Sequence, residues 1–548
     1  MLIECKNIKK YYGDRLIFNI EDLKVYSEDR IGLVGTNGEG KTTLLNILAG
    51  IDSEYEGSIK TYGDFSIIEQ LDKEEQGSIN SEAAKAFGVN TKWNTNLSGG
   101  EKSRFKLAKG FHENSNMIIA DEPTSNLDIE GVELLEKKFK EYKGAFIIVS
   151  HDREFLDRLC NKIFDLNKGQ IKEYKGNYSD YREQKNQELN RAAFEYEQYN
   201  REKRRIKDSI EQVKRKENSI KRTPSRMGNS EARLHKMGGQ KSKANLNKTI
   251  KNMEKRLDHM DIKEKPNEIK KIRLDVPDKN KLYSSVIIQG DNINKSFKNK
   301  IIFENAEFTI CNNSKNALIG PNGCGKSTIL KMIVKGDGLI KKSKKLKIGY
   351  YSQELDIVEE ELSILENVTK GSIYDETFIR ITLARLLFKD RDVYKKVKIL
   401  SGGERVKVCF AKLILSDINL LILDEPTNYL DVDSLEIVEE VLKDYSGAIL
   451  LVSHDRRFIN AIADNILYIE NHKIKTSKGT YEEYMEKRNN PVIDREEEIR
   501  KQIFVLENRL SEIIGKLSAH SKKDDVKALD TEYYKILNEI QQLSSSLG

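Results

Sequence analysis

The feature that most constrains the fold is an internal repeat of four short motifs, which occur twice in the same order. The first copies are GTNGEGKT from Gly35, LSGGE from Leu97, ADEPTSNLD from Ala120 and IVSHD from Ile148. The second copies are GPNGCGKS from Gly320, LSGGE from Leu400, LDEPTNYLD from Leu423 and LVSHD from Leu451. In both copies the serine of LSGGE precedes the glutamate of DEP by 24 residues, and that glutamate precedes the histidine by 29. The chain therefore contains two copies of one domain.

Short apolar runs precede the motifs and predict the same α/β fold in both copies. Residues 30–34 run into the first glycine-rich turn, and residues 41–48 after it are expected to form a helix. The acidic motif and the Ser-His pair each follow a continuous apolar run, at residues 117–120, 146–149, 420–423 and 449–452. Such runs are typical of strands that are buried on both faces of a mostly parallel sheet.

Each GxxxxGK[ST] motif predicts a loop that binds the phosphates of ATP. Its glycines let backbone N–H groups surround a phosphate at the N-terminus of the following helix. Lys41 and Lys326 are expected to neutralise the β and γ oxygens, and the hydroxyls of Thr42 and Ser327 are expected to ligate Mg²⁺. The predicted ATP-binding residues of the two loops are Gly35, Asn37, Gly38, Gly40, Lys41, Thr42 and Thr43, and Gly320, Asn322, Gly323, Gly325, Lys326, Ser327 and Thr328.

Acidic residues and a histidine complete the chemistry of each copy. The aspartate that ends the apolar run can hold a magnesium-bound water. The glutamate after it can orient or deprotonate the attacking water. A single histidine is often a core residue, but one repeated at a fixed spacing favours contact with the γ-phosphate. The predicted metal-site aspartates are Asp121 and Asp424, and the predicted catalytic residues are Glu122, Glu425, His151 and His454.

Four further residues are predicted to contact the nucleotide or its metal. Gln70 and Gln353 follow apolar, aromatic-containing runs, from which each can reach Mg²⁺ and the attacking water. Tyr12 and Phe297 lie near the start of each copy and are placed to stack on adenine, although an aromatic residue there could also be part of the core.

The composition excludes several classes of protein. No run of about 18 apolar residues is present, so no membrane span is expected. The first residues lack the apolar region of a signal peptide. The five cysteines, Cys5, Cys160, Cys311, Cys324 and Cys409, are scattered without a C-x-x-C pair, which argues against zinc or iron–sulfur modules and favours five small buried residues in a reducing cytosol.

These motifs, in this order, resemble those of the ABC ATPases over residues 1–178 and 284–487. In that family two domains pair head to tail, so that each ATP lies between the phosphate loop of one domain and the LSGGE motif of the other. The resemblance implies one site with Lys41, Glu122 and His151 and a second with Lys326, Glu425 and His454. The opposing motif residues are Ser401, Gly402 and Gly403 for the first site and Ser98, Gly99 and Gly100 for the second. Two departures could make the sites unequal: Glu39 in the first phosphate loop, and Asn428-Tyr429 in place of Ser125-Asn126.

A strongly basic segment lies between the two copies. Residues 201–256 contain 19 Lys+Arg and 6 Asp+Glu, whereas the net charge of the whole chain is only +6. A dense positive field favours a phosphate-rich partner. Apolar or small residues recur with three- and four-residue spacing from Leu189 to Ile220 and again from Leu246 to Met260, which predicts an antiparallel α-helical hairpin with coiled-coil packing over residues 179–283.

Two ATPase domains joined by a basic hairpin resemble the ABC-F family, and residues 223–241 resemble the hairpin tip of its antibiotic-resistance subgroup. That resemblance implies a monomeric cytoplasmic protein that binds the bacterial ribosome. Its hairpin would enter the tRNA exit site, contact ribosomal RNA and the P-site tRNA, and displace drugs of the lincosamide, pleuromutilin and streptogramin A types from the peptidyl-transferase centre. The short first domain, with 57 residues from Lys41 to Ser98 against 75 from Lys326 to Ser401, also favours this subgroup. The tip residues expected to contact RNA are Arg226, Met227, Arg233, Leu234, His235, Lys236 and Met237.

Other hypotheses remain at this stage. The chain could relieve stalled ribosomes without a role in resistance, could power a membrane exporter, or could bind DNA through its hairpin. The last segment, residues 488–548, carries two apolar stripes separated by a polar break and is predicted to form a smaller helical hairpin.

Overall fold

The fold is described from a computed structural model of the 548-residue chain. The described residues are 1–69, 78–94, 97, 99–112, 115–219, 229–263, 284–297, 300–352, 357–388, 391–427, 430–489, 503, 506, 509–510, 513–514 and 526–545, with the backbone alone described for 229–241, 526–530, 532 and 542–545.

The first domain is built on a six-stranded sheet in the order β5-β6-β7-β3-β8-β9, which is parallel except for the last strand. Its central strands β6 and β7 are buried and, apart from the final Asp121 of β6, apolar, as the continuous runs predict. The parallel strands end at one edge, which brings the phosphate loop and the acidic motif together. The strands are β3 Arg30–Val34, β5 Phe65–Ile68, β6 Met117–Asp121, β7 Ala145–Val149, β8 Lys162–Asn167 and β9 Gln170–Lys175.

A three-stranded antiparallel sheet and the helices cover this central sheet on its two faces. The small sheet and α1 bury their apolar side chains against one face, and the remaining helices pack on the other. The small sheet consists of β1 Ile3–Tyr12, β2 Arg15–Val25 and β4 Glu56–Thr61. The helices are α1 Lys41–Leu48, α2 Ser81–Phe87, α3 Gly99–His112, α4 Ile129–Glu141 and α5 Arg153–Leu159.

The second domain repeats this architecture, with the strand order β14-β15-β16-β12-β17-β18 in its central sheet and β11-β10-β13 in its small sheet. Its helical part is larger, as the longer spacing of the motifs predicts. The strands are β10 Val286–Phe297, β11 Lys300–Cys311, β12 Lys315–Ile319, β13 Ile340–Lys342, β14 Ile348–Tyr351, β15 Leu420–Asp424, β16 Ala448–Val452, β17 Asn465–Glu470 and β18 Lys473–Lys478. The helices are α8 Lys326–Lys335, α9 Ile364–Thr369, α10 Glu376–Arg385, η1 Asp392–Tyr394, η2 Val397–Ile399, α11 Gly402–Ile414, α12 Val432–Asp444, α13 Arg456–Ile462 and α14 Tyr481–Asn489. The predicted pair of α/β ATPase domains is confirmed.

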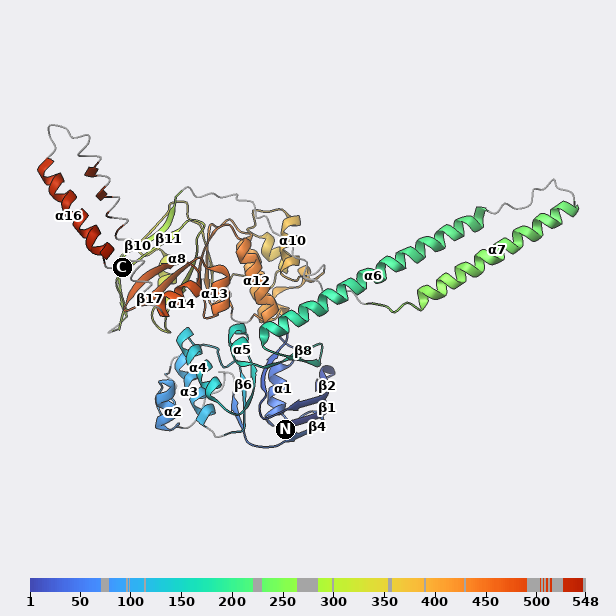
Figure 1. The fold of residues 1–548 in the computed structure, drawn as a ribbon, viewed down its shortest axis with the longest axis horizontal. Helices are drawn as coiled ribbons and strands as arrows, with labels where there is room; N and C mark the ends of the chain where they lie inside the picture. Colours follow the sequence, from blue (N-terminus) through green and yellow to red (C-terminus); the bar gives the residue numbers. More distant parts are fainter. Residues whose placement is uncertain are drawn as a thin grey trace.

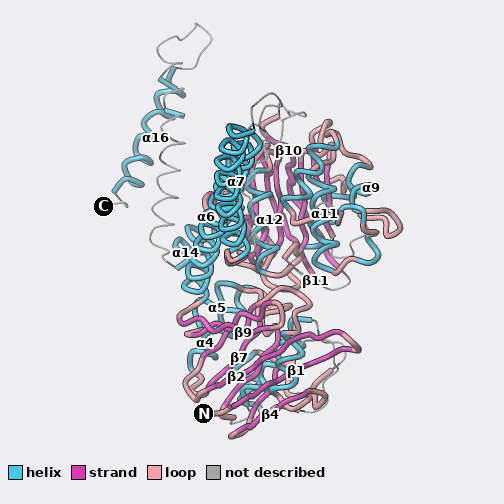
Figure 2. The backbone as a smooth tube through the Cα atoms, turned by 90° about the vertical axis from the view of Figure 1, so that its right-hand side faces the viewer, coloured by secondary structure: helices cyan, strands magenta, loops and turns pink. Residues whose placement is uncertain are grey.

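Two long helices, α6 Tyr178–Ser219 and α7 Asn229–Asp258, leave the boundary between the domains and run antiparallel away from both (Figure 1). Seen from the end, the two helices lie together and point toward the viewer (Figure 2). Their mutual contact is centred on Ile206, Ile210 and Ile250, which are buried. The predicted apolar stripe is longer than this contact, because Leu189 near the base of α6 is exposed.

Three sequence expectations concern the rest of the chain. The C-terminal segment contains one continuous described helix, α16 Val526–Ser545, and much of its predicted partner lies outside the described residues. Cys5, Cys160 and Cys409 are buried as expected, but Cys311 is exposed and Cys324 is half-buried, so the expectation of five buried cysteines was wrong. None of the helices in the described ranges combines the length and apolar character needed to cross a bilayer.

Candidate active sites at the domain boundary

The two phosphate loops have the same internal geometry. Each follows a buried strand and leads into a helix, with Gly40 and Gly325 in the left-handed region at the helix N-cap. A side chain is excluded there, because a Cβ on Gly40 would lie 2.6 Å from Cγ2 of Ile17. Lys41 Nζ donates to the carbonyl oxygens of Gly35 and Thr36, at 2.8 and 3.1 Å.

Lys326 makes the matching bonds in the second loop, where its Nζ donates to Gly320 O at 2.7 Å and to Pro321 O at 3.1 Å. Both lysines are buried, and burial lowers the pKa of Lys41. The loops thus hold a buried ammonium group at the N-terminus of a helix, which is the arrangement that binds the β- and γ-phosphates of a nucleotide.

The aspartate at the end of each acidic strand lies beside the hydroxyl that follows the lysine. Burial raises the pKa of Asp121, and a hydrogen bond with Thr42 counteracts this rise. Burial likewise raises the pKa of Asp424, and hydrogen bonds with Ser327 and Tyr350 counteract it.

The described residues fit Mg²⁺ bound jointly by the protein and the nucleotide. Oδ2 of Asp121 is buried and has no hydrogen-bond partner among them, so an acceptor remains for a metal-bound water. The described residues contain no cluster of three His, Cys, Asp or Glu that could hold a metal on its own. The hydroxyl of Thr42 or Ser327 and the phosphates would then supply the direct ligands.

The glutamate after each aspartate is held in an unusual backbone conformation beside the histidine. Glu122 and Glu425 have φ values of 49° and 50°, in the left-handed region that a glutamate seldom adopts. Nε2 of His151 lies 3.4 Å from Oε1 of Glu122, and Nε2 of His454 lies 3.2 Å from Oε1 of Glu425. The repeat therefore matches in backbone strain as well as in residue type.

Burial shifts the pKa values of these groups toward their neutral forms. It raises the pKa of Glu122 and of Glu425 to about 8. It lowers the pKa of His151 to about 4 and that of His454 to about 3, so both imidazoles are neutral near pH 7. A carboxyl with a pKa near the working pH suits a general base for an attacking water.

Residues that follow the DEP motif reach the phosphate loop of the opposite domain. The amide N–H of Asn322 donates to Oδ2 of Asp128 at 2.9 Å, and its side-chain amide donates to Asn126 O at 2.9 Å. In the mirror contact the N–H of Asn37 donates to Oδ2 of Asp431 at 3.2 Å. The structure thus brings the two domains together head to tail.

The LSGGE motifs open helices α3 and α11, and the first of them lies at this boundary. Gly99 begins α3, and a Cβ on Gly100 would lie 2.9 Å from Nδ2 of Asn322 in the second phosphate loop. Ser401 caps α11 through a capping box with Glu404.

Two arginines at the centre of the domain boundary were missed by the sequence analysis. Arg153 pairs with Glu439 of the other domain, and Arg456 pairs with Glu136, and all four residues are buried. Each arginine directly follows the histidine-aspartate pair of its domain. The repeat itself carried the signal, because both copies continue with arginine after SHD.

The remaining predicted residues fall into two groups. Tyr12 and Phe297 end β1 and β10 with about half of each side chain exposed, and the Tyr12 hydroxyl lies 3.2 Å from Oγ1 of Thr43. Gln70, Ser98, Gln353, Arg226 and Met227 lie outside the described residues, whereas the backbone of Arg233, Leu234, His235, Lys236 and Met237 is part of α7.

Comparisons with known proteins agree with this architecture. The ABC transporter family model matches residues 18–86 and 303–428. The ribosome protection protein VmlR of Bacillus subtilis is 31% identical over 99% of this chain and 98% of its own length. The erythromycin resistance ATP-binding protein MsrA of Staphylococcus epidermidis is 32% identical over 84% of this chain and 96% of its own length. ABC transporter F family member 5 of Arabidopsis thaliana is 28% identical over 88% of this chain and 77% of its own length.

The chain belongs to the ABC-F family of ABC ATPases. It is an ATPase that uses ATP and Mg²⁺.

Proposed function

We propose that this protein binds the bacterial ribosome in its ATP-bound form and protects it from antibiotics that act at the peptidyl-transferase centre. The observation that carries the proposal is the charge of the projecting hairpin. Its described portions, residues 201–219 and 242–258, contain 13 Lys+Arg against 6 Asp+Glu, and all of these cations except Lys203 are exposed. Ribosomal RNA offers phosphates along the whole length of such a surface.

The names of two relatives favour the ribosome, rather than nucleic acid in general, as the partner. One matches nearly the whole chain and is named a ribosome protection protein, and another is named for erythromycin resistance. The shared length includes the hairpin between the domains. We extend the proposal to the tRNA exit site, where the tip near residues 226–237 would contact RNA and the P-site tRNA.

In this proposal the chain acts as a cytoplasmic monomer of four parts: ATPase domains at 1–178 and 284–487, the hairpin at 179–283 and a C-terminal extension at 488–548. ATP closes the domains into the ribosome-binding form, and hydrolysis releases the protein.

In this proposal each group has its own step in hydrolysis. Mg·ATP, when bound, supplies the metal and the γ-phosphorus that is attacked. Lys41 and Lys326 neutralise charge that develops on the phosphate oxygens. Glu122 and Glu425 accept the proton of the attacking water at the carboxylate. The neutral imidazoles of His151 and His454 lie beside these two carboxylates.

A growth experiment tests the proposal in a drug-sensitive bacterium. Expression of the protein is expected to raise the inhibitory concentration of a lincosamide, a pleuromutilin or a streptogramin A. The triple variant Arg204→Glu, Arg205→Glu, Lys207→Glu should lose this effect, because all three side chains are exposed on α6. A matched triple reversal at Lys395, Lys396 and Lys398 in the second domain should retain it.

Unchanged sensitivity to all three drugs at confirmed expression would contradict the resistance role. Ribosome binding without resistance would then favour a factor that relieves stalled ribosomes.

A further inference from the structure

The first turn of α12 contacts two functional parts of the molecule at once. Asp431, which caps this helix, accepts a hydrogen bond from the N–H of Asn37 in the first phosphate loop. Asp433 and Glu436, on the same turn, pair with Arg182 at the base of α6, where Nη1 lies 2.9 Å from Oδ1 of Asp433. One helix end in the second domain therefore contacts the first ATP site and the hairpin. We refer to these contacts as the first junction.

The base of α6 is also fixed in the first domain. Tyr178 and Tyr181 are buried in its core. Nζ of Lys185 lies 2.8 Å from Oδ2 of Asp165, which is paired with Val34 in the strand register directly before the first phosphate loop. Further along α6, Glu188 pairs with Lys172 and accepts a hydrogen bond from Tyr174 in β9, and beyond it Ile206 and Ile210 pack against α7. The direction of the hairpin is thus determined where α6 contacts both domains.

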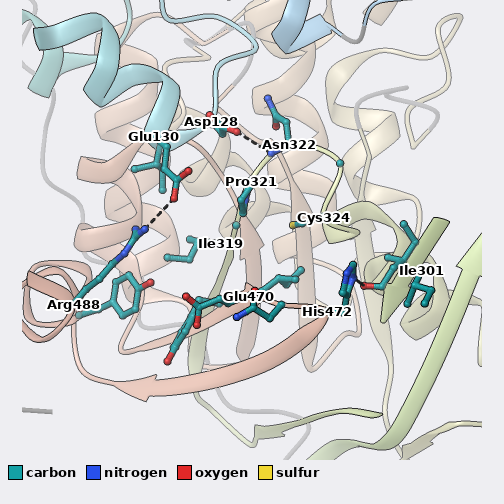
Figure 3. A pocket seen from close by; sticks show the side chains of 18 of the residues that line it. Asp128, Glu130, Ile301, Ile319, Pro321, Asn322, Cys324, Glu470, His472 and Arg488 are labelled. Atoms are coloured by element: carbon teal, nitrogen blue, oxygen red, sulfur yellow. Dashed lines mark hydrogen bonds and ion pairs between the residues drawn. The ribbon is translucent and has the colours of Figure 1, made fainter. Parts of the chain in front are cut away.

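The pseudo-equivalent place at the other ATP site, the second junction, is built differently. Tyr481 and Tyr484 of α14 occupy the positions of Tyr178 and Tyr181, but Met485 stands where α6 has Arg182. Arg488 reaches Glu130 across this junction at 2.9 Å, at an exposed position near the end of α14 (Figure 3).

The space at the two junctions differs accordingly. The second junction contains a cavity of about 460 Å³ between the phosphate loop, the start of α4 and α14. The corresponding cavity at the first junction is about 20 Å³ and is lined by Arg182 and Lys185. The hairpin therefore joins the closed junction, and the short helix α14 joins the open one.

We propose that Arg182 is a positioning residue that ties the direction of the hairpin to the state of the first ATP site. While the first site is closed, Asn37 holds α12 and α12 holds Arg182, so α6 is clamped between the domains. Opening of that site withdraws α12 and leaves α6 attached to the first domain alone. The second site has no such connection through Met485. This regulation rests on the proposed function only for the use of the hairpin as the ribosome-binding element.

Distance measurements by pulsed electron paramagnetic resonance test the coupling without a ribosome. Spin labels at Glu211→Cys in α6 and Lys443→Cys in α12 report the hairpin, and labels at the pseudo-equivalent Lys140→Cys and Lys443→Cys report closure of the domains. Exposed Cys311 and half-buried Cys324 are first changed to Ser. The protein carries Glu122→Gln and Glu425→Gln and is saturated with ATP.

With Arg182 present, each label pair should give a single, narrow distance distribution. Arg182→Met should at least double the width of the hairpin distance distribution and leave the closure distance distribution unchanged. In the protein that keeps both glutamates, the same substitution should leave ATPase activity within about twofold. Arg182→Lys, which keeps the charge, should restore most of the narrow distance. The matched control Arg488→Met breaks the ion pair at the second junction and should leave both distances unchanged.

Three results would overturn the proposal. They are a hairpin distance distribution that stays narrow in Arg182→Met, a loss of domain closure in that variant, or an equally widened hairpin distribution in Arg488→Met. Failure of the protein to bind ribosomes would overturn the proposed function instead, because neither distance depends on a ribosome.

Discussion

The two ATP sites share their chemistry but differ in what surrounds them. Lys41 and Lys326 make the same two backbone bonds, and Glu122 and Glu425 hold the same strained conformation beside a histidine. The first junction is closed by the base of α6, whereas the second contains a cavity of about 460 Å³. Both halves therefore keep the same site residues, but only the first half connects its site to the hairpin, through Arg182.

The largest effect should come from removing the general base in each half. Glu122→Gln and Glu425→Gln together should lower kcat for ATP by about 10²-fold or more, because the attacking water loses its proton acceptor. Each single variant should lower the rate to a similar extent, since the Glu–His distances are 3.4 and 3.2 Å. Steady-state phosphate release measures the hydrolysis rate of each variant. A loss of rate in only one of the two single variants would contradict the expectation that both sites are equally active.

The next effect concerns the buried arginines that join the halves. Arg153→Leu leaves Glu439 buried without its partner, which should cost about 3–5 kcal/mol. Arg456→Leu should cost less, because Glu136 keeps its ion pair with Arg158 at 3.0 Å. The thermal midpoint of the intact protein should fall in both variants. Arg380→Leu breaks an exposed ion pair on α10 and serves as the control, with a much smaller expected fall in the midpoint. Midpoints that match this control would show that the boundary does not depend on the central ion pairs.

Stability should also depend on pH through the two catalytic glutamates. Their pKa in the folded protein is about 8, above the ordinary value of 4.5, so the folded state binds more protons than the unfolded state between these values. This contribution to stability is present at low pH and is lost as the pH rises toward 8. The double glutamine variant should therefore melt at least about 2 °C above the parent at pH 8, with a smaller gap at pH 5. If the difference in melting temperature between variant and parent instead grew toward pH 5, these carboxyls would not be held neutral in the folded protein.

The smallest effect compares the two aromatic residues near the phosphate loops. Tyr12→Ala and Phe297→Ala should each weaken ATP binding at their own site about 3- to 10-fold, in line with the ~0.5–1.5 kcal/mol of an aromatic contact. Tyr12→Phe keeps the ring and should bind ATP as the parent does. Titration calorimetry measures both affinities, and unchanged binding in the alanine variants would assign the rings a purely structural role.

Sequence spacing was sufficient to predict which residues of one domain lie together, such as Lys41, Glu122 and His151, because each motif lies on one short strand–loop–helix unit. It also indicated both hairpin helices, since apolar residues at three- and four-residue intervals mark a helix face.

Contacts between the domains could not be read in this way. Arg153 and Glu439 are 286 positions apart, and Arg182 and Asp433 are 251 apart, so each pair depends on how two folded units are placed. The difference between Arg182 and Met485 gained meaning only when the structure placed both at junctions beside a phosphate loop.

Ribosome binding by the trapped protein tests the central claim most directly. The Glu122→Gln, Glu425→Gln variant is mixed with bacterial ribosomes and centrifuged through a sucrose cushion with or without ATP. The protein should enter the ribosomal pellet with ATP, remain in the supernatant without it, and leave the pellet as the salt concentration rises. Absence from the pellet with saturating ATP, in a protein shown to bind ATP, would contradict the account.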